Sequence, residues 1–125
     1  MKNIINTIEA PAAINYSQAI EVNGTLYLSG QIPLNPKTME LEESNDVEKQ
    51  TYQILENIQV ILEKNNYCFE NIVKITTYTI NLDDFIKINK IYNKVFININ
   101  SARSLIEVSR LPKNSNVMIE IIASK

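Results

Sequence analysis

The sequence contains no histidine among its 125 residues. This absence excludes imidazole-based acid–base catalysis, nucleophile systems of the Ser-His-Asp and Cys-His types, and metal sites built on histidine. An enzyme made from this chain would have to work with carboxylates, arginine, tyrosine, backbone groups and water.

Cysteine, long apolar runs and net charge are also scarce, and their scarcity narrows the class of protein. The only cysteine, Cys68, excludes an intrachain disulfide, and because no base is visible near it we expect a small buried or half-buried residue. No stretch approaches the roughly 20 apolar residues of a membrane helix, and MKNIINTIEA lacks the apolar run of a secretory signal. The net charge of -2 and the pI near 5.2 provide no general attraction to nucleic acid or anionic membranes. These features predict a cytoplasmic protein with a single domain, residues 1–125.

Glycine occurs only twice. Gly24 follows Asn23 between two strand-like runs, a pattern typical of a type I′ hairpin turn. Gly30, between Ser29 and Gln31, has no such explanation. Because glycine is used where the backbone turns unusually or comes close to another group, the sequence predicts a close approach at Gly30.

Hydrophobic periodicity predicts two helices, one from about Asp46 to Lys64 and one from Asp83 or Asp84 to about residue 97. Asn45 and Glu48 resemble a capping box for the first. The residues predicted to be buried are Val47, Ile54, Leu55, Ile58, Ile61 and Leu62 in the first helix and Phe85, Ile88, Tyr92, Val95 and Phe96 in the second. Strands are expected at 19–22, 25–29, 71–80, 102–110 and 116–124, with or without a short N-terminal strand. The order β-β-α-β-α-β-β predicts an α+β fold, a sheet with two helices on one face.

The last predicted strand is apolar on both sides. Val117, Ile119, Ile121 and Ala123 alternate with Met118, Glu120 and Ile122. Two helices cover only one face of a sheet, so the second face is expected to meet another subunit.

Arg103 and Glu120 are the charged residues that stand out within these strands. Arg103 is either a structural ion-pair partner of Glu107 or Glu120, or a fork that binds a substrate carboxylate. Glu120 is either the partner of Arg103 or a group kept for acid–base work. Tyr16 alone reads as a surface loop residue, and Asn89 alone would be interpreted as facing solvent.

Four segments in order resemble the reactive intermediate deaminase family, the RidA or YjgF-type proteins. APAAINYSQAI is similar to the family pattern APxAIGPYSQA, and LYLSGQIPLNPKT to SGQxPxxPxTG. NIVKITTYTINLDDFIKINKIY resembles DIVKTTVFxxDxxDFxxxNxxY, and ARSLIEVSRLPKNSNVMIEIIA resembles PARSxVEVxxLPxxxxVEIExIA. The resemblance covers nearly the whole chain.

The resemblance implies a chorismate-mutase-like α+β fold assembled as a homotrimer, with clefts between subunits. It implies a deaminase that hydrolyses 2-imino acids, such as 2-iminopropanoate and 2-iminobutanoate, to 2-oxo acids and ammonia. Neither a metal nor a cofactor is implied, and neither nucleic acid nor a membrane is an expected partner.

The roles of single residues follow from the same resemblance. Arg103 matches the arginine that binds the substrate carboxylate, and Glu120 the glutamate that orients or activates the attacking water. Tyr16 matches a cleft tyrosine and Asn89 a nearby asparagine. The backbone at Ser29 and Gly30 matches the loop that approaches the ligand, so a side chain at Gly30 is expected to intrude on substrate.

The chain departs from the family pattern at three places. Asn15 alone stands where the family has Gly-Pro before the tyrosine, and NINSARS lacks the Phe-Pro that often precedes ARS. Leu105, at the substrate site, stands where the deaminase branch commonly has cysteine, which makes that pocket more apolar. A binding or regulatory protein that recognises 2-oxo acids with little or no turnover is the main alternative. A nuclease or translation inhibitor is disfavoured by the acidic pI.

Overall fold

The computed structural model describes residues 1–41 and 45–125. The helices are α1 (Val47–Lys64) and α2 (Phe85–Val95), and the strands are β1 (Lys2–Ile5), β2 (Ala19–Val22), β3 (Thr25–Leu28), β4 (Ile72–Thr79), β5 (Ala102–Glu107) and β6 (Val117–Ser124). The predicted order is confirmed, including the N-terminal strand, and the fold is α+β. No helix among the described residues is sufficiently long and apolar to span a membrane.

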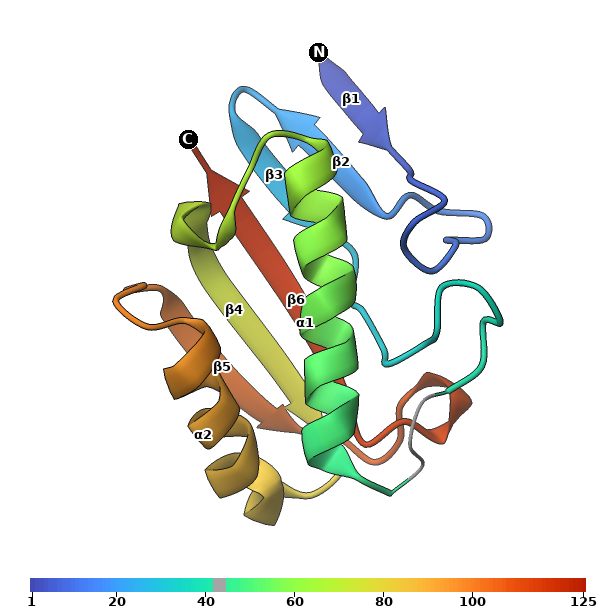
Figure 1. The fold of residues 1–125 in the computed structure, drawn as a ribbon, viewed down its shortest axis with the longest axis vertical. Coiled ribbons are helices and arrows are strands. Elements are labelled where there is room, and N and C mark those ends of the chain that lie inside the picture. Colours follow the sequence, from blue (N-terminus) through green and yellow to red (C-terminus); the bar gives the residue numbers. More distant parts are fainter. Residues whose placement is uncertain (42–44) are drawn as a thin grey trace.

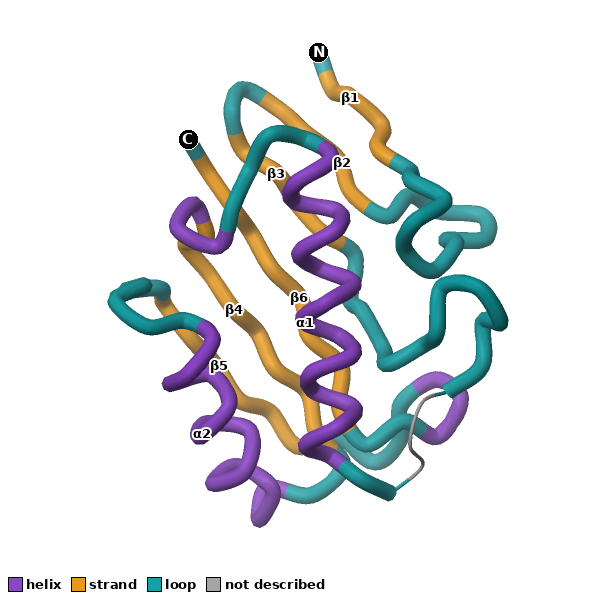
Figure 2. Tube along the Cα trace, in the orientation of Figure 1, coloured by secondary structure: helices purple, strands orange, loops and turns teal. Residues whose placement is uncertain are grey.

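The strands form one mixed sheet in the order β1-β2-β3-β6-β4-β5. Neighbouring strands run antiparallel except β4 and β5, which are parallel and joined through α2. Figure 1 shows both helices in front of the sheet, with α1 over its centre and α2 over β4 and β5. Coloured by secondary structure, Figure 2 shows the β5 edge beside α2 and the long loops gathered on the opposite side of α1. The sheet therefore has a helix-covered face and an open face.

The burial of β6 follows this division. Val117, Ile119, Ile121 and Ala123 are buried beneath the helices, whereas the alternating residues of the strand are only half-buried. On the open face, the side chains of Tyr27 and Ile106 are 49% and 41% exposed. The predicted alternation is confirmed, and one chain leaves the second apolar face uncovered.

Local signals in the sequence account for most of the boundaries. Asn23 and Gly24 both have positive φ, as a type I′ turn requires, and Lys125 leaves no room for a Cβ at Gly24. All six predicted apolar residues of α1 are buried, and Asn65 ends the helix. The capping box predicted at Asn45 is wrong. Asp46 is the N-cap, and its side chain accepts a hydrogen bond from the backbone N–H of Lys49, 3.1 Å away.

Two predictions of burial are also wrong, and a third is met only in part, because Val95 is half-buried against the core. Phe85 opens α2 at its exposed end, with 48% of its surface accessible, and Ile91 is buried instead. Cys68 is exposed because it precedes a short 3-10 turn, Phe69–Asn71, where the Asn71 carboxamide accepts from both its N–H and its Sγ. The end of α2 falls at Val95, two residues before the predicted limit, and the Asp84 side chain makes no capping hydrogen bond.

Candidate active site

A pocket of about 160 Å³ lies between α2 and β5 on the helix-covered side of the sheet. We call it the α2–β5 pocket. Its lining residues are Thr77, Phe85, Ile88, Asn89, Tyr92, Arg103, Ser104 and Leu105. Three of the residues that the sequence singles out, Asn89, Arg103 and Leu105, therefore border one cavity.

Arg103 lies on β5 opposite Ile75 of β4, a register that turns its side chain toward the helices. Its guanidinium carbon is 5.2 Å from the centre of the Tyr92 ring and 6.0 Å from that of Phe96. A guanidinium stacks well on an aromatic face, so these rings hold it at the pocket.

The ion pair that would make Arg103 merely structural is not formed within residues 1–41 and 45–125. The Glu107 carboxylate accepts instead from the backbone N–H of Leu82, 3.0 Å away. Glu120 pairs in register with Thr76, whereas Arg103 is level with Ile75, so the two side chains lie on opposite faces. The donors of Arg103 are left available for an anionic ligand.

The remaining polar groups of the pocket carry no charge. The hydroxyls of Thr77 and Tyr92 are 2.7 Å apart and hydrogen-bonded to each other. Burial raises the pKa of Tyr92 well above its usual range, which keeps the phenol neutral. Asn89 does not face solvent alone, because it is half-buried and lines the pocket. Its amide makes no hydrogen bond within the described chain.

Glu120 is half-buried on the open face between Met118 and Ile122, as its strand position predicts. The Tyr78 hydroxyl donates a hydrogen bond to its carboxylate at 3.4 Å. Burial raises the pKa of Tyr78, and the nearby negative charge of Glu120 raises it further. Tyr78 was missed in the sequence, although its position in β4, two residues after Thr76, puts it on the same face as Glu120.

The close approach expected at Gly30 is to another side chain. A Cβ at this position would lie 2.8 Å from the sulfur of Met118, on the open face. The neighbouring Ser29 donates its hydroxyl hydrogen to the backbone carbonyl of Ser17 at 2.6 Å. Ser29 thus ties the end of β3 to the loop that carries Tyr16, and whether substrate also approaches Gly30 remains a prediction.

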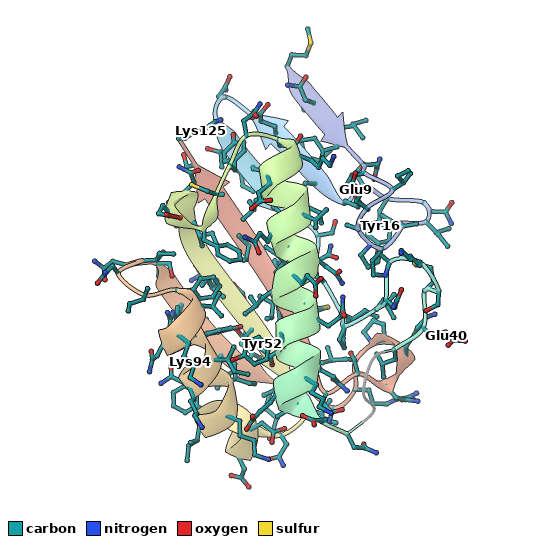
Figure 3. All side chains as sticks on the ribbon, viewed as in Figure 1. Glu9, Tyr16, Glu40, Tyr52, Lys94 and Lys125 are labelled. Carbon is teal, nitrogen blue, oxygen red and sulfur yellow. The ribbon has the colours of Figure 1, made fainter. Side chains whose placement is uncertain are left out.

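Tyr16 is 59% exposed in the loop before β2. Figure 3 places it on the opposite side of the molecule from Lys94 of α2. Within one chain, the candidate residues therefore form two groups, the α2–β5 pocket and a second group that we call the open-face group. The open-face group consists of Ser29, Gly30 and Glu120, together with the loop that carries Tyr16, to which Ser29 is hydrogen-bonded at Ser17.

Gln18 fixes the loop of the open-face group and is 1% exposed. Its Nε2 donates to the carbonyls of Thr7, Ala10 and Pro11 at 2.9, 3.3 and 2.8 Å, and its Oε1 accepts from the Thr7 N–H at 2.6 Å. We expect Gln18→Ala to lower the free energy of unfolding by about 2–3 kcal/mol because it leaves buried backbone groups without partners.

Urea denaturation at a fixed chain concentration measures this loss. The matched control is Gln59→Ala, since the exposed Gln59 carboxamide donates to Glu63 on the same helix and its loss should change stability by less than about 0.5 kcal/mol. Equal stabilities for the two variants would contradict the role given to Gln18.

The fold occurs in known proteins. A family model described as Endoribonuclease L-PSP matches residues 7–125. A RutC family protein of Pyrococcus horikoshii is 44% identical, over 100% of this chain and 99% of its own. The structure of a conserved Rid family protein from Yersinia pestis is 48% identical, with a TM-score of 0.96 and 100% of both chains covered. The structure of Escherichia coli TdcF with bound serine is 35% identical, with a TM-score of 0.91 and 98% of both chains covered.

Proposed function

The chain belongs to the Endoribonuclease L-PSP family, which includes the Rid and RutC proteins, and on that premise we propose that it is an imine deaminase. The proposed reaction converts 2-imino acids such as 2-iminopropanoate and 2-iminobutanoate to 2-oxo acids and ammonia, without metal or cofactor. The observation that carries this proposal is the guanidinium of Arg103, which has no ion-pair partner among the described residues and lies at an apolar pocket.

In this proposal Arg103 binds the substrate carboxylate. The planar guanidinium offers paired N–H donors that match both carboxylate oxygens, and the Tyr92 ring beneath it limits its movement. Asn89, whose amide is free within the described chain, contacts the polar end of the substrate. Binding by these groups holds the imine carbon in place for attack.

The site is completed by a second copy of the chain. Glu120 and Arg103 lie on opposite faces of one sheet, so a single chain does not bring them together. The open face is partly apolar and uncovered, which is unusual for a monomer. We propose a homotrimer in which the α2–β5 pocket of one chain faces the open-face group, including Tyr16 and Glu120, of its neighbour.

Hydrolysis then needs little beyond positioning. Glu120 holds a water and takes a proton from it as the water oxygen bonds to the imine carbon, and the Glu120 carboxyl then passes this proton to the former imine nitrogen. In the carbinolamine so formed, Glu120 transfers the hydroxyl proton to the nitrogen as the carbon–nitrogen bond breaks, so that ammonia leaves and the hydroxyl oxygen becomes the carbonyl oxygen of the 2-oxo acid. Since the imine carbon is already electrophilic, holding water and substrate together supplies much of the rate.

We expect the purified protein to speed ammonia release from 2-iminopropanoate or 2-iminobutanoate formed in situ, and EDTA to leave the rate unchanged. The measurement is ammonia released per minute, compared with buffer and with heat-inactivated protein. If no 2-imino acid is hydrolysed faster than in buffer, the proposal fails.

A second candidate is a regulatory protein that binds 2-oxo acids without turnover. It is favoured by the separation of Glu120 from Arg103, which leaves one chain with a carboxylate-binding group and no acid–base group nearby. Calorimetric binding of a 2-oxo acid together with absent ammonia release would select this candidate. Ribonuclease activity, named in the family description, is not proposed, because the net charge of -2 gives little attraction to phosphates.

A further inference from the structure

The walls of the α2–β5 pocket next to Arg103 are apolar. Phe85 and Ile88 border it from α2, and Leu105 borders it from β5. Arg103 and Leu105 are two residues apart on one strand, so their side chains leave the same face about 6–7 Å apart. A ligand carboxylate held by Arg103 therefore has its own side chain within reach of Leu105.

The size of the pocket indicates how large that side chain is. A dry apolar cavity of about 150 Å³ is sufficient to hold a benzene molecule. The α2–β5 pocket, at about 160 Å³, matches an isobutyl, thioether or benzyl group. A methyl or ethyl group would leave most of its lining without contacts and forfeit the dispersion attraction.

The polar atoms of the pocket support an uncharged occupant. The Thr77 and Tyr92 hydroxyls bond to each other at 2.7 Å, so the pair does not depend on a ligand. Apart from Arg103, no charged residue of the described chain lines the pocket. A second charge on the ligand would have no partner beside Ile88 and Leu105.

We propose that the α2–β5 pocket selects 2-imino acids with large apolar side chains, those that correspond to leucine, methionine and phenylalanine, over the two smallest members of the class. This inference rests on the proposed imine hydrolysis for its substrate, but the size preference also applies to binding of the matching 2-oxo acids. Phe85, Ile88 and Leu105 are the residues that determine it.

Two measurements test the preference. Isothermal titration should find that 4-methyl-2-oxopentanoate binds at least about tenfold more tightly than pyruvate, because a single added methylene in an apolar pocket can already contribute about tenfold and the isobutyl group has three more carbons than methyl. With imines generated by L-amino acid oxidase, kcat/KM from leucine should exceed that from alanine by a similar factor. Equal or reversed affinities for the two oxo acids would overturn the inference whether or not turnover occurs.

Variants locate the preference in this pocket. Leu105→Phe fills it and Phe85→Ala opens it to solvent, and each should bring the ratio of the two affinities toward one. Phe85 is 48% exposed, so we expect the Phe85→Ala variant to fold. The control is Ile86→Phe, which adds a ring at a 77% exposed position of α2 outside the pocket and should leave the ratio unchanged. An unchanged ratio in both pocket variants overturns the assignment. If 4-methyl-2-oxopentanoate binds more tightly than pyruvate but no imine is hydrolysed, the proposed deaminase activity is refuted and the size preference of the pocket is retained.

Discussion

Replacement of Arg103 by alanine is expected to lower kcat/KM for 2-imino acids by about ten- to a hundredfold, the equivalent of a lost hydrogen bond to a charged group. Arg103→Lys should not restore the activity, because an ammonium makes neither the paired contact with a carboxylate nor the same stacking on Tyr92. Steady-state kinetics of ammonia release measures both variants.

The control for this prediction is the only other arginine. Arg110 is exposed and outside the α2–β5 pocket, so Arg110→Ala should keep the wild-type kinetics. Thermal unfolding of the same preparations separates binding from stability, since loss of an exposed cation–π contact costs only about 0.5–1 kcal/mol. A folded Arg103→Ala protein with near-normal kcat/KM would show that this arginine does not hold the substrate.

Two inactive variants are expected to restore each other when their chains are mixed. Arg103→Ala lacks the proposed carboxylate-binding group, and Glu120→Gln lacks the proposed base, so each alone should lose most activity. Because the two residues lie on opposite faces of the sheet, the proposed cleft takes one from each of two chains. Unfolding an equal mixture and refolding it together should therefore recover about a quarter of the wild-type activity, the fraction of clefts with both intact residues.

Refolding each variant alone is the first control, and Glu107→Gln, on the other face from Glu120, is the second. Sedimentation equilibrium on the same samples should give about three times the 14.3 kDa of one chain. No recovery in a mixture that has formed trimers would mean that Arg103 and Glu120 do not share a cleft. A mass of one chain in a fully active sample would contradict both the assembly and the shared site.

The elements of the fold were predictable because their signals are local and repeated. The apolar stripe of α1 recurs over several turns, and the Asn23-Gly24 pair allows few backbone conformations. The two-sided alternation of β6 identified which face Glu120 occupies. These signals need no knowledge of distant neighbours.

The wrong predictions concern residues whose burial or hydrogen bonding depends on a neighbour distant in the sequence or on the first turn of a helix. Asn45 and Asp46 are both good caps, and only the backbone conformation chose Asp46. Phe85 fits the helical period, but it lies at the first position of α2 and is 48% exposed. An ion pair between Arg103 and Glu120 was plausible from composition alone. Its absence depends on the register of β4 with β5 and β6, which no pattern within one strand reveals.

The position of β5 in the sheet has a consequence for motion. β5 pairs with β4 alone and forms an edge, whereas β6 is flanked by β3 and β4. Edge strands open locally at lower free energy than central strands, and parallel pairing is slightly weaker per residue. Arg103 and Leu105 thus stand on the strand that opens more readily, so the β5 wall of the α2–β5 pocket is expected to move more than the centre of the sheet. Glu120 stands on a strand flanked on both sides, where the proposed water molecule would be held in a more constant position.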